Sequence, residues 1–385
     1  MPTRRSFLNI IELLAIGQLA SGCKKSDADL KISLLKGSVP PQSLKLFNQY
    51  FSSNTSFDFH SRAQLIELFN LLEYWKSQQK KYTNDSWPRV SMLPSQKSDI
   101  SDLVTLGDSW LTQAIQKDLI QPITISSWHN WHKLPSYWQN LVIRDQNGIP
   151  NKNGFVWGAP YRWGTTLIAY RADKLDGEIK DWSDLWDPKL ENRISLVDQP
   201  REVIGLTLKK LNKSYNTKNL KNIPQLRSEL QAFNKQVKYY NSQYYLQPLL
   251  MGEVWASVGW SNDIIPILSR NRNIKAVIPS SGTSLWSDIW VAPKNNNIST
   301  LSEIAQRWIN FCWEPEMVNL ISLFTNASSP MINNLNNKQL FPEVINNPLL
   351  CLQPSIFNKC DFIEPLSIEE QKEYIKLWLE IKNTK

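Results

Sequence analysis

The amino-acid sequence predicts an α/β protein built from two lobes. Three units, each a short apolar strand followed by a turn and an amphipathic helix, follow one another between Leu30 and Ile115. Short apolar segments rich in β-branched residues then recur as far as Ala292. This alternation favours a parallel sheet covered by helices. A chain of 385 residues is also longer than one domain of ordinary size, so two lobes are expected.

The three N-terminal units are recognised from their hydrophobic periodicity. Their strands are expected at residues 30–35, 57–60 and 103–106. The first helix follows the turn at residues 37–41 and has an apolar face made of Leu44, Phe47 and Phe51. The second helix has such a face made of Leu65, Leu68, Phe69 and Leu72. The third opens at residues 107–109 and reaches Ile115.

The rest of the chain continues the α/β pattern. A long buried strand is expected at residues 163–171, and shorter strands at 194–197, 256–258 and 289–292. Pro200 suits the first position of a helix. Two later helices are expected to begin with capping boxes, made of Thr300 with Glu303 and of Ser367 with Glu370. The Asn-rich residues 333–347 are expected to form a surface connection.

Composition excludes several classes of protein. The chain is 42% hydrophobic and 20% charged, which excludes intrinsic disorder. The formal net charge is +8, but the basic residues are spread along the chain with no block of like charges. We therefore expect no nucleic-acid partner. The 17 tryptophans supply large aromatic surfaces that either fill a core or line a ligand cleft.

The first residues have the features of an export signal. A basic segment containing Arg4 and Arg5 precedes a short apolar stretch, and small residues precede Cys23. The arginine pair resembles a twin-arginine signal, and residues 19–23 resemble a bacterial lipobox. We expect residues 1–22 to be removed, and residues 23–29 to form a lipidated N-terminus and linker that hold the protein to the membrane in the periplasm. The alternative is a plain N-terminal helix.

The other three cysteines suggest no metal site. Cys312 lies in an apolar helical pattern and is expected to be buried. Cys351 and Cys360 either form a disulfide in an oxidising compartment or remain free thiols, and the sequence leaves both alternatives open. The cysteine spacings match no zinc pattern.

Motifs for catalysis are missing from the sequence. No nucleophile elbow, phosphate-binding glycine loop or dinucleotide fingerprint occurs. His129 and His132 have a spacing that would suit a metal, but no accompanying acidic residue completes the site. The chain is therefore predicted to be neither an enzyme nor a carrier of a cofactor or metal. A secreted carbohydrate-active hydrolase that uses two of the acidic residues is the alternative.

Candidate ligand-binding residues lie in turns that follow the predicted strands. Ligands of open α/β sheets bind at such turns. Tryptophan and carboxylate side chains occur together in several of them, and this combination suits an organic cation. The candidate residues are Ser38, Asp108, Trp110, Gln199, Glu202, Trp260, Trp286 and Asp288.

Five stretches resemble the spermidine/putrescine-binding periplasmic proteins of ABC transporters. They are residues 157–175, 182–211, 251–263, 284–293 and 303–317. The resemblance implies a periplasmic-binding-protein fold, with two α/β lobes joined by crossing strands that close on a ligand. It also implies an ABC permease as partner and no catalytic role. We expect a monomer whose first lobe comprises residues 30–162 and 289–330, and whose second lobe comprises residues 163–288 and 331–385.

The resemblance also assigns roles to individual residues. Trp260 and Trp286 match the aromatic wall of the family's ligand site, and Asp288 matches the carboxylate that holds a ligand amine. Glu202 matches the acidic residue of a D-x-R-E turn, whereas Gln199 stands where polyamine binders have an aspartate. The expected ligand is a small cation such as a polyamine. The same fold binding an anion or a metal is the further alternative.

Overall fold

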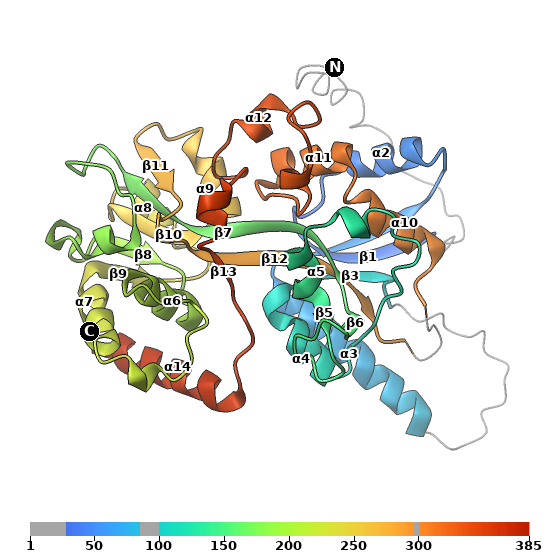
Figure 1. Cartoon of the computed structure of the whole chain (residues 1–385), viewed down its shortest axis with the longest axis horizontal. Coiled ribbons are helices and arrows are strands. Elements are labelled where there is room, and N and C mark those ends of the chain that lie inside the picture. Colours follow the sequence, from blue (N-terminus) through green and yellow to red (C-terminus); the bar gives the residue numbers. More distant parts are fainter. Residues whose placement is uncertain (1–27, 85–99, 296–299, 385) are drawn as a thin grey trace, which may run out of the picture.

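The protein forms two α/β lobes that lie side by side (Figure 1). This computed structural model describes residues 28–84, 100–295 and 300–384. The expected export signal and Cys23 lie outside the described residues. Within the described part of the chain, none of the helices has the length and apolar character needed to cross a bilayer.

The first lobe is built on the three predicted β-α units. Its parallel strands are β1 (Leu30–Leu35), β2 (Phe57–Arg62) and β3 (Leu103–Gly107), in the spatial order β2-β1-β3. The helices that follow them are α2 (Gln42–Tyr50), α3 (Leu65–Asn84) and α4 (Leu111–Gln116). The apolar faces predicted from the sequence are buried here: Phe47, Leu68 and Leu72 are each at most 1% exposed. The β-α rhythm was therefore predicted correctly.

Two long antiparallel strands, β7 (Ala159–Arg171) and β12 (Ser284–Pro293), cross the middle of the molecule and join the lobes (Figure 1). Near its start β7 pairs with β12, which in turn pairs with β3 of the first lobe. Towards its end β7 pairs with strands of the second lobe. Both strands are longer than predicted, because polar residues such as Ser287 and Asp288 interrupt the apolar pattern that marks a buried strand.

The second lobe has mixed strands covered by helices. Its strands are β8 (Ile194–Leu196), β9 (Val237–Tyr240), β10 (Ala256–Trp260) and β11 (Ile274–Val277). Its larger helices are α6 (Pro200–Lys210), α7 (Leu226–Gln236), α9 (Ser261–Leu268) and α14 (Ile368–Lys382). Pro200 opens α6, as predicted.

Shorter elements complete the chain. The remaining helices are α5 (Ser136–Val142), α8 (Gln247–Leu250), α10 (Glu303–Phe311), α11 (Pro315–Thr325), α12 (Pro342–Ile345) and α13 (Pro354–Phe357). The remaining strands are β4 (Ile120–Gln121), β5 (Ile143–Arg144), β6 (Phe155–Val156) and β13 (Asp361–Phe362). The 3-10 helices are η2 (Asp108–Trp110), η3 (Trp131–Lys133), η4 (Trp182–Trp186), η5 (Pro188–Leu190), η6 (Leu220–Asn222) and η7 (Ile332–Asn334).

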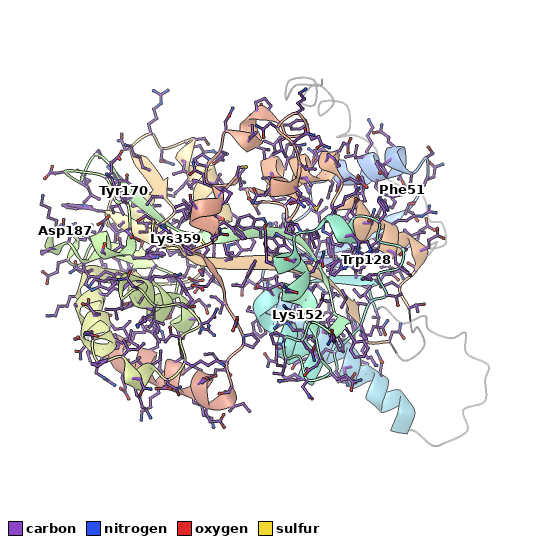
Figure 2. The ribbon with its side chains drawn as sticks, viewed as in Figure 1. Phe51, Trp128, Lys152, Tyr170, Asp187 and Lys359 are labelled. Atoms are coloured by element: carbon purple, nitrogen blue, oxygen red, sulfur yellow. The ribbon has the colours of Figure 1, made fainter. Side chains whose placement is uncertain are left out.

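Each lobe has its own hydrophobic core. Side chains fill both lobes in Figure 2, where Trp128 belongs to the core of the first lobe and Tyr170 to that of the second. Leu340 and Val344 also pack in the first core, whereas Trp378 of α14 packs in the second. We therefore propose that the C-terminal part of the chain returns to the second lobe only after about residue 352, rather than at residue 331.

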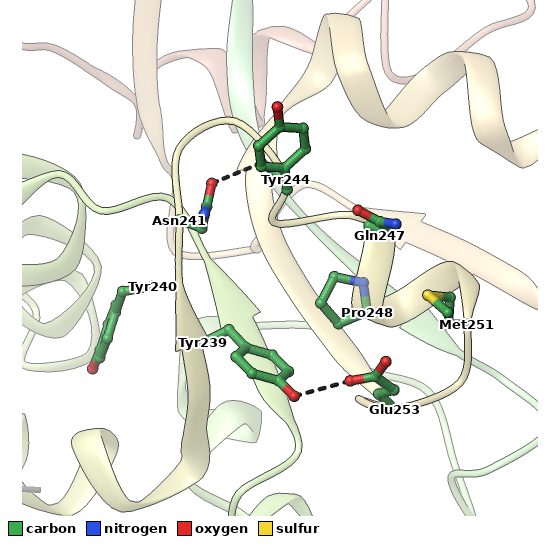
Figure 3. A pocket seen from close by; sticks show the side chains of 8 residues that line it. All are labelled: Tyr239, Tyr240, Asn241, Tyr244, Gln247, Pro248, Met251 and Glu253. Carbon is green, nitrogen blue, oxygen red and sulfur yellow. Dashed lines mark hydrogen bonds between the residues drawn. The ribbon is translucent and has the colours of Figure 1, made fainter.

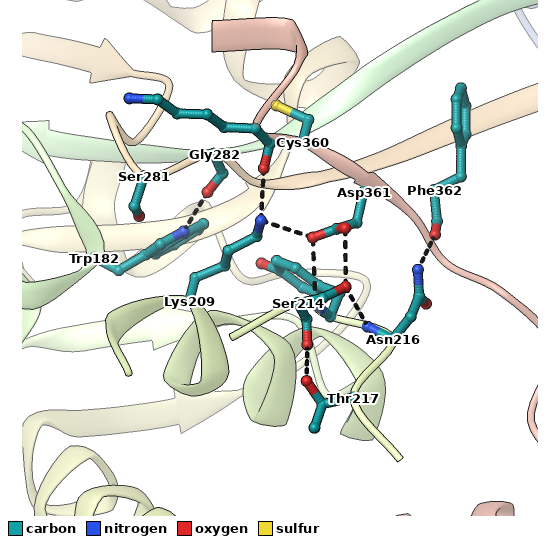
Figure 4. A network of polar contacts seen from close by, with 12 residues as sticks. Trp182, Lys209, Ser214, Asn216, Thr217, Ser281, Gly282, Cys360, Asp361 and Phe362 are labelled. Atoms are coloured by element: carbon teal, nitrogen blue, oxygen red, sulfur yellow. Dashed lines mark hydrogen bonds and ion pairs between the residues drawn. The ribbon is translucent and has the colours of Figure 1, made fainter. Parts of the chain in front are cut away.

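The returning segment is held by polar contacts (Figure 4). The strand β13 pairs with β12, and the Asp361 carboxylate accepts hydrogen bonds from Ser214 at 2.9 Å and from the Lys209 ammonium at 2.7 Å. Asn216 donates to the carbonyl oxygen of Phe362 at 2.7 Å. The chain therefore connects the lobes a third time, beside the two long strands.

The helix caps and connections partly match the prediction. The Ser367–Glu370 capping box at the start of α14 is present. At α10 the cap is Ser302 rather than Thr300, because the Ser302 hydroxyl accepts a hydrogen bond from the Ala305 N–H. Residues 333–347 include a helix and buried apolar residues, so they are more than a surface connection.

The described cysteines are all free thiols. Cys312 is fully buried, as predicted. Cys351 and Cys360 form no disulfide in the structure, which agrees with the second of the two alternatives.

A glycine inside α6 provides a test of the packing in the second lobe. A Cβ atom on Gly205 would lie 1.9 Å from a ring carbon of Tyr215. Although alanine favours a helix by about 1 kcal/mol over glycine, we expect Gly205→Ala to lower the free energy of unfolding, because overpacking costs about 1–3 kcal/mol. In a Tyr215→Leu background the same change should be neutral or stabilising. Urea unfolding of the four proteins checks this, and equal effects in both backgrounds would contradict it.

Candidate functional site

The candidate site lies where β7 and β12 meet the end of β3. Asp288 on β12 stands directly opposite Arg162 of β7 and Gly107 of β3. Asp108, the first residue after β3, accepts a hydrogen bond from the Ser287 backbone N–H at 3.1 Å. The predicted residues Asp108, Trp286 and Asp288 are therefore brought together at the junction of the lobes.

A buried ion pair occupies the centre of this site. Nε of Arg162 donates to Oδ2 of Asp288 at 2.6 Å. The two side chains are only 4% and 2% exposed. They lie on the same face of the sheet because residues directly opposite each other in antiparallel strands point the same way. The carboxylate that the sequence predicts to hold a ligand amine thus has an arginine of this chain as its partner.

Trp286 packs next to this pair. It stands opposite Gly164, where a Cβ atom would lie 2.3 Å from an indole carbon. The missing side chain of Gly164 therefore makes room for the indole ring. The Arg162 guanidinium lies 5.7 Å from the centre of the ring, within the range of a cation–π contact. The indole N–H is buried and has no hydrogen-bond partner in the described ranges.

Trp260 ends β10 and is held by Tyr245. The Trp260 backbone N–H donates to the Tyr245 hydroxyl oxygen at 3.0 Å, and that hydroxyl donates to Asp263 at 2.9 Å. The two aromatic rings meet edge to face, with centroids 6.1 Å apart. Burial raises the pKa of Asp263, while its contacts with Tyr245 and the charge of Arg162 oppose the rise. Trp260 and its neighbouring carboxylate are thus fixed in position.

Glu202 lies in the first turn of α6, and both of its oxygens accept hydrogen bonds from Ser284, at 2.8 and 3.0 Å. Burial raises the pKa of this carboxyl to about 6, against the opposing effect of its contacts with Ser284 and Thr166. Gln199, the N-cap residue of α6, is exposed, and its side chain makes no capping hydrogen bond. Glu202 is therefore bound to the β12 strand, whereas Gln199 faces solvent.

The remaining two predicted residues differ in their surroundings. Ser38 is fully buried just after β1. The Trp110 ring packs against Phe69 of α3, with centroids 4.8 Å apart. Trp110 therefore contacts a covering helix of the first lobe.

Two arginines near the site were not predicted. Arg162 lies inside a buried strand whose other charged residue, Arg171, is at its end, and a charge with buried neighbours on both sides is a signal that sequence reasoning can use. Arg144 is 5% exposed and donates two hydrogen bonds to the Leu141 carbonyl oxygen. Its charge acts on Asp108. The second arginine has no such signal, because only the fold brings it near Asp108.

The carboxyl of Asp108 has a strongly raised pKa. Burial raises its pKa to about 7, and the negative charge of Asp288 adds to the rise. The hydrogen bond from Ser287 and the charge of Arg144 act in the opposite direction. Near neutral pH, the Asp108 carboxyl is therefore partly protonated.

Other polar features lie away from this site. A pocket of about 280 Å³ on the second lobe is lined by tyrosines, and in it the Tyr239 hydroxyl donates to Glu253 at 2.9 Å (Figure 3). His129 is exposed and faces Glu314 at 3.2 Å. In the part of the chain that the structure describes, no three side chains are grouped as metal ligands would be.

Comparison with known proteins places this geometry in a family. The sequence profile of the bacterial extracellular solute-binding proteins matches residues 98–360, which include β7, β12 and all but Ser38 of the predicted site. The chain belongs to this family. Its relatives are binding proteins of transport systems rather than enzymes, so the prediction of a non-enzymatic binding protein is confirmed.

Several relatives of this solute-binding protein have named ligands. The spermidine/putrescine-binding periplasmic protein of Salmonella typhimurium is 29% identical over 259 residues, which cover 67% of this chain and 71% of that protein. A putrescine-binding periplasmic protein of Pseudomonas aeruginosa is 25% identical over 308 residues, which cover 74% and 79%. The predicted resemblance to the spermidine/putrescine-binding proteins is confirmed.

Solved structures confirm the two-lobed fold. The spermidine/putrescine ABC transporter substrate-binding protein of Streptococcus pneumoniae superposes with a TM-score of 0.75 at 20% identity, covering 92% of this chain and 98% of that one. A lipoprotein of Treponema pallidum superposes with a TM-score of 0.66 at 17% identity, covering 92% and 99%.

The acidity of Asp108 predicts a pH dependence of stability. Its pKa is raised from 3.8 to about 7 in the folded protein. Ionisation of Asp108 therefore lowers the free energy of unfolding, and this loss grows as the pH rises from about 4 to about 7. Asp108→Asn removes that cost and keeps an oxygen for the Ser287 N–H. Relative to the parent, we expect the variant to gain about 2–3 kcal/mol between pH 5 and pH 8.

Urea unfolding at several pH values measures this gain. Glu202→Gln serves as the comparison: its relative gain should level off about one pH unit lower, since the pKa of Glu202 is about 6. If the free energies of unfolding of the parent and of Asp108→Asn differ by the same amount at pH 5 and at pH 8, the raised pKa of Asp108 is contradicted.

Proposed function

We propose that this protein is the extracytoplasmic substrate-binding subunit of an ABC transporter and captures a small organic amine between its lobes. The observation that carries the proposal is the family match over residues 98–360, with relatives named for binding spermidine and putrescine. Its partner would be the permease of the same transporter, and we expect it to act as a monomer.

The candidate site has groups suited to an ammonium ion. Trp260 and Trp286 are partly exposed, so their ring faces are available for cation–π contact. Asp263, which shares Tyr245 with Trp260, places negative charge beside these rings. Indole faces together with carboxylates attract organic cations without any catalytic group, as a transport protein requires.

The connections between the lobes suit closure on a ligand. β7 contributes side chains to both cores, and β12, whose core residues belong to the first lobe, runs beside it. Bending of these strands would move the lobes as rigid bodies, which is the hinge motion of many binding proteins. The ligand would then be enclosed at the junction that holds Arg162 and Asp288.

The solute bound in the cell tests this function. We expect native mass spectrometry of protein purified from its source to show a bound small organic amine. Adding that amine to the stripped protein should reduce the radius of gyration measured by small-angle X-ray scattering, because the lobes close. Protein that never carries a small solute, or whose radius stays unchanged at saturation, would contradict the proposal.

We further propose that the protein is anchored to the membrane through lipid on Cys23. The small residues before Cys23 and the twin arginines at the start support this anchor. Cys23→Ser should move the protein from the membrane fraction to the soluble extracytoplasmic fraction. Cell fractionation and immunoblotting measure the shift, and a Cys23→Ser protein that still sediments with membranes would rule the anchor out.

A further inference from the structure

The carboxylates of the candidate site are matched by arginines of the same chain. Asp288 pairs with Arg162, and the charge of the same guanidinium also acts on Asp263. The charge of Arg144 acts on Asp108. In a site for a polycation, the ligand itself would neutralise the carboxylates. Here arginines of the protein supply that positive charge.

The fourth carboxylate follows the same pattern. Arg201 precedes Glu202 in α6, and its charge acts on the Glu202 carboxylate. Burial raises the pKa of Glu202 to about 6, so this acid also holds its negative charge less readily than in water. Four carboxylates thus face three arginines, and the formal surplus of one negative charge falls short of the two or three ammonium groups of a polyamine.

The ion pair itself blocks one ammonium position. Nε of Arg162, 2.6 Å from Oδ2 of Asp288, occupies one acceptor position of this carboxylate, so an amine that takes this position displaces the guanidinium. Displacement would leave a guanidinium that is 4% exposed without its counter-ion. Because breaking a buried pair leaves an uncompensated charge, this exchange is strongly unfavourable.

The unpaired groups around the pair are hydrogen-bond donors. An arginine has five N–H groups; one donates to Asp288, and the side chain also interacts with the Tyr161 hydroxyl. Most of its N–H groups thus have no hydrogen bond to any residue that the structure describes. The buried indole N–H of Trp286 and Nη1 of Arg144 are likewise without partners in the described ranges. The last two donors are buried, and a buried donor requires an acceptor.

We propose that the amine bound by this protein also carries a carboxylate, and that Arg162 is the residue that selects it. The terminal N–H groups of Arg162 and the indole N–H of Trp286 hold the ligand carboxylate, while the tryptophan faces and Asp263 receive its ammonium group. Arginine suits this role because its planar N–H groups match the geometry of a carboxylate. The inference rests on the proposed function and specifies its ligand class.

Matched ligand pairs test this selection directly. 4-Aminobutanoate differs from putrescine in having a carboxylate in place of one terminal CH2–NH3+ group, and lysine differs from cadaverine by an added carboxylate. Isothermal titration calorimetry with the parent should show at least one of the two acids binding ten times more tightly than its matched diamine. In Arg162→Gln the order should reverse, because the carboxylate loses its donors and Asp288 loses its cation.

A second variant and a control distinguish a change in ligand preference from a defect in folding. Asp288→Asn keeps the shape of the site and leaves the Arg162 charge unbalanced, so it should increase the preference for the acid. Arg171→Gln serves as the control, because Arg171 lies on the same strand but pairs with Asp173 away from the site. The control should keep the ratio of affinities of the parent.

The outcomes separate this inference from the function on which it rests. A diamine that binds the parent more tightly than its matched acid, or a ratio that Arg162→Gln leaves unchanged, overturns the role of Arg162 but leaves a solute-binding protein. The parent binding neither member of either pair also overturns the inference. Failure of the proposed function would be seen separately, as protein from the source that carries no small solute in native mass spectrometry.

Discussion

The pairing of β7 with β12 is the constraint on which both the fold and the candidate site depend. β7 pairs with strands of both lobes, β12 pairs with β7 and with β3 of the first lobe, and nearly every residue in the two strands is buried. A charge in such a position is tolerated only when a partner neutralises it. The strand register provides that partner by placing Arg162 opposite Asp288. The backbone pairing that joins the lobes therefore also creates the central ion pair.

The same burial controls the chemistry of the surrounding acids. Low local polarity raises the pKa of Asp108, Glu202 and Asp263, and hydrogen bonds from backbone or hydroxyl groups oppose each rise. Groups held in this way are fixed in orientation before any ligand arrives. Recognition at such a site depends on which ligand completes the existing contacts, since a ligand that breaks them loses more than it gains.

Much of the architecture was predictable from hydrophobic periodicity alone. The strands around Ile32, Val104 and Val258 and the apolar helix faces follow local patterns, and residue order carries that information. The family motifs also marked the turns that meet at β12. The ion pair was harder to predict, because Arg162 and Asp288 are 126 positions apart in sequence and only the strand register brings them into contact. Arg144 near Asp108 depends on tertiary packing in the same way.

The segment that leads through β13 to α14 has a mechanical consequence. Two adjacent strands can bend as a hinge, but they can also twist about their common direction. The third connection, fixed by the contacts of Asp361 with Lys209 and Ser214, resists that twist because it is tied to the second lobe beside the strand pair. The lobe closure proposed above would thereby be restricted towards a single axis. The two halves of the ligand site would then meet in the same alignment each time.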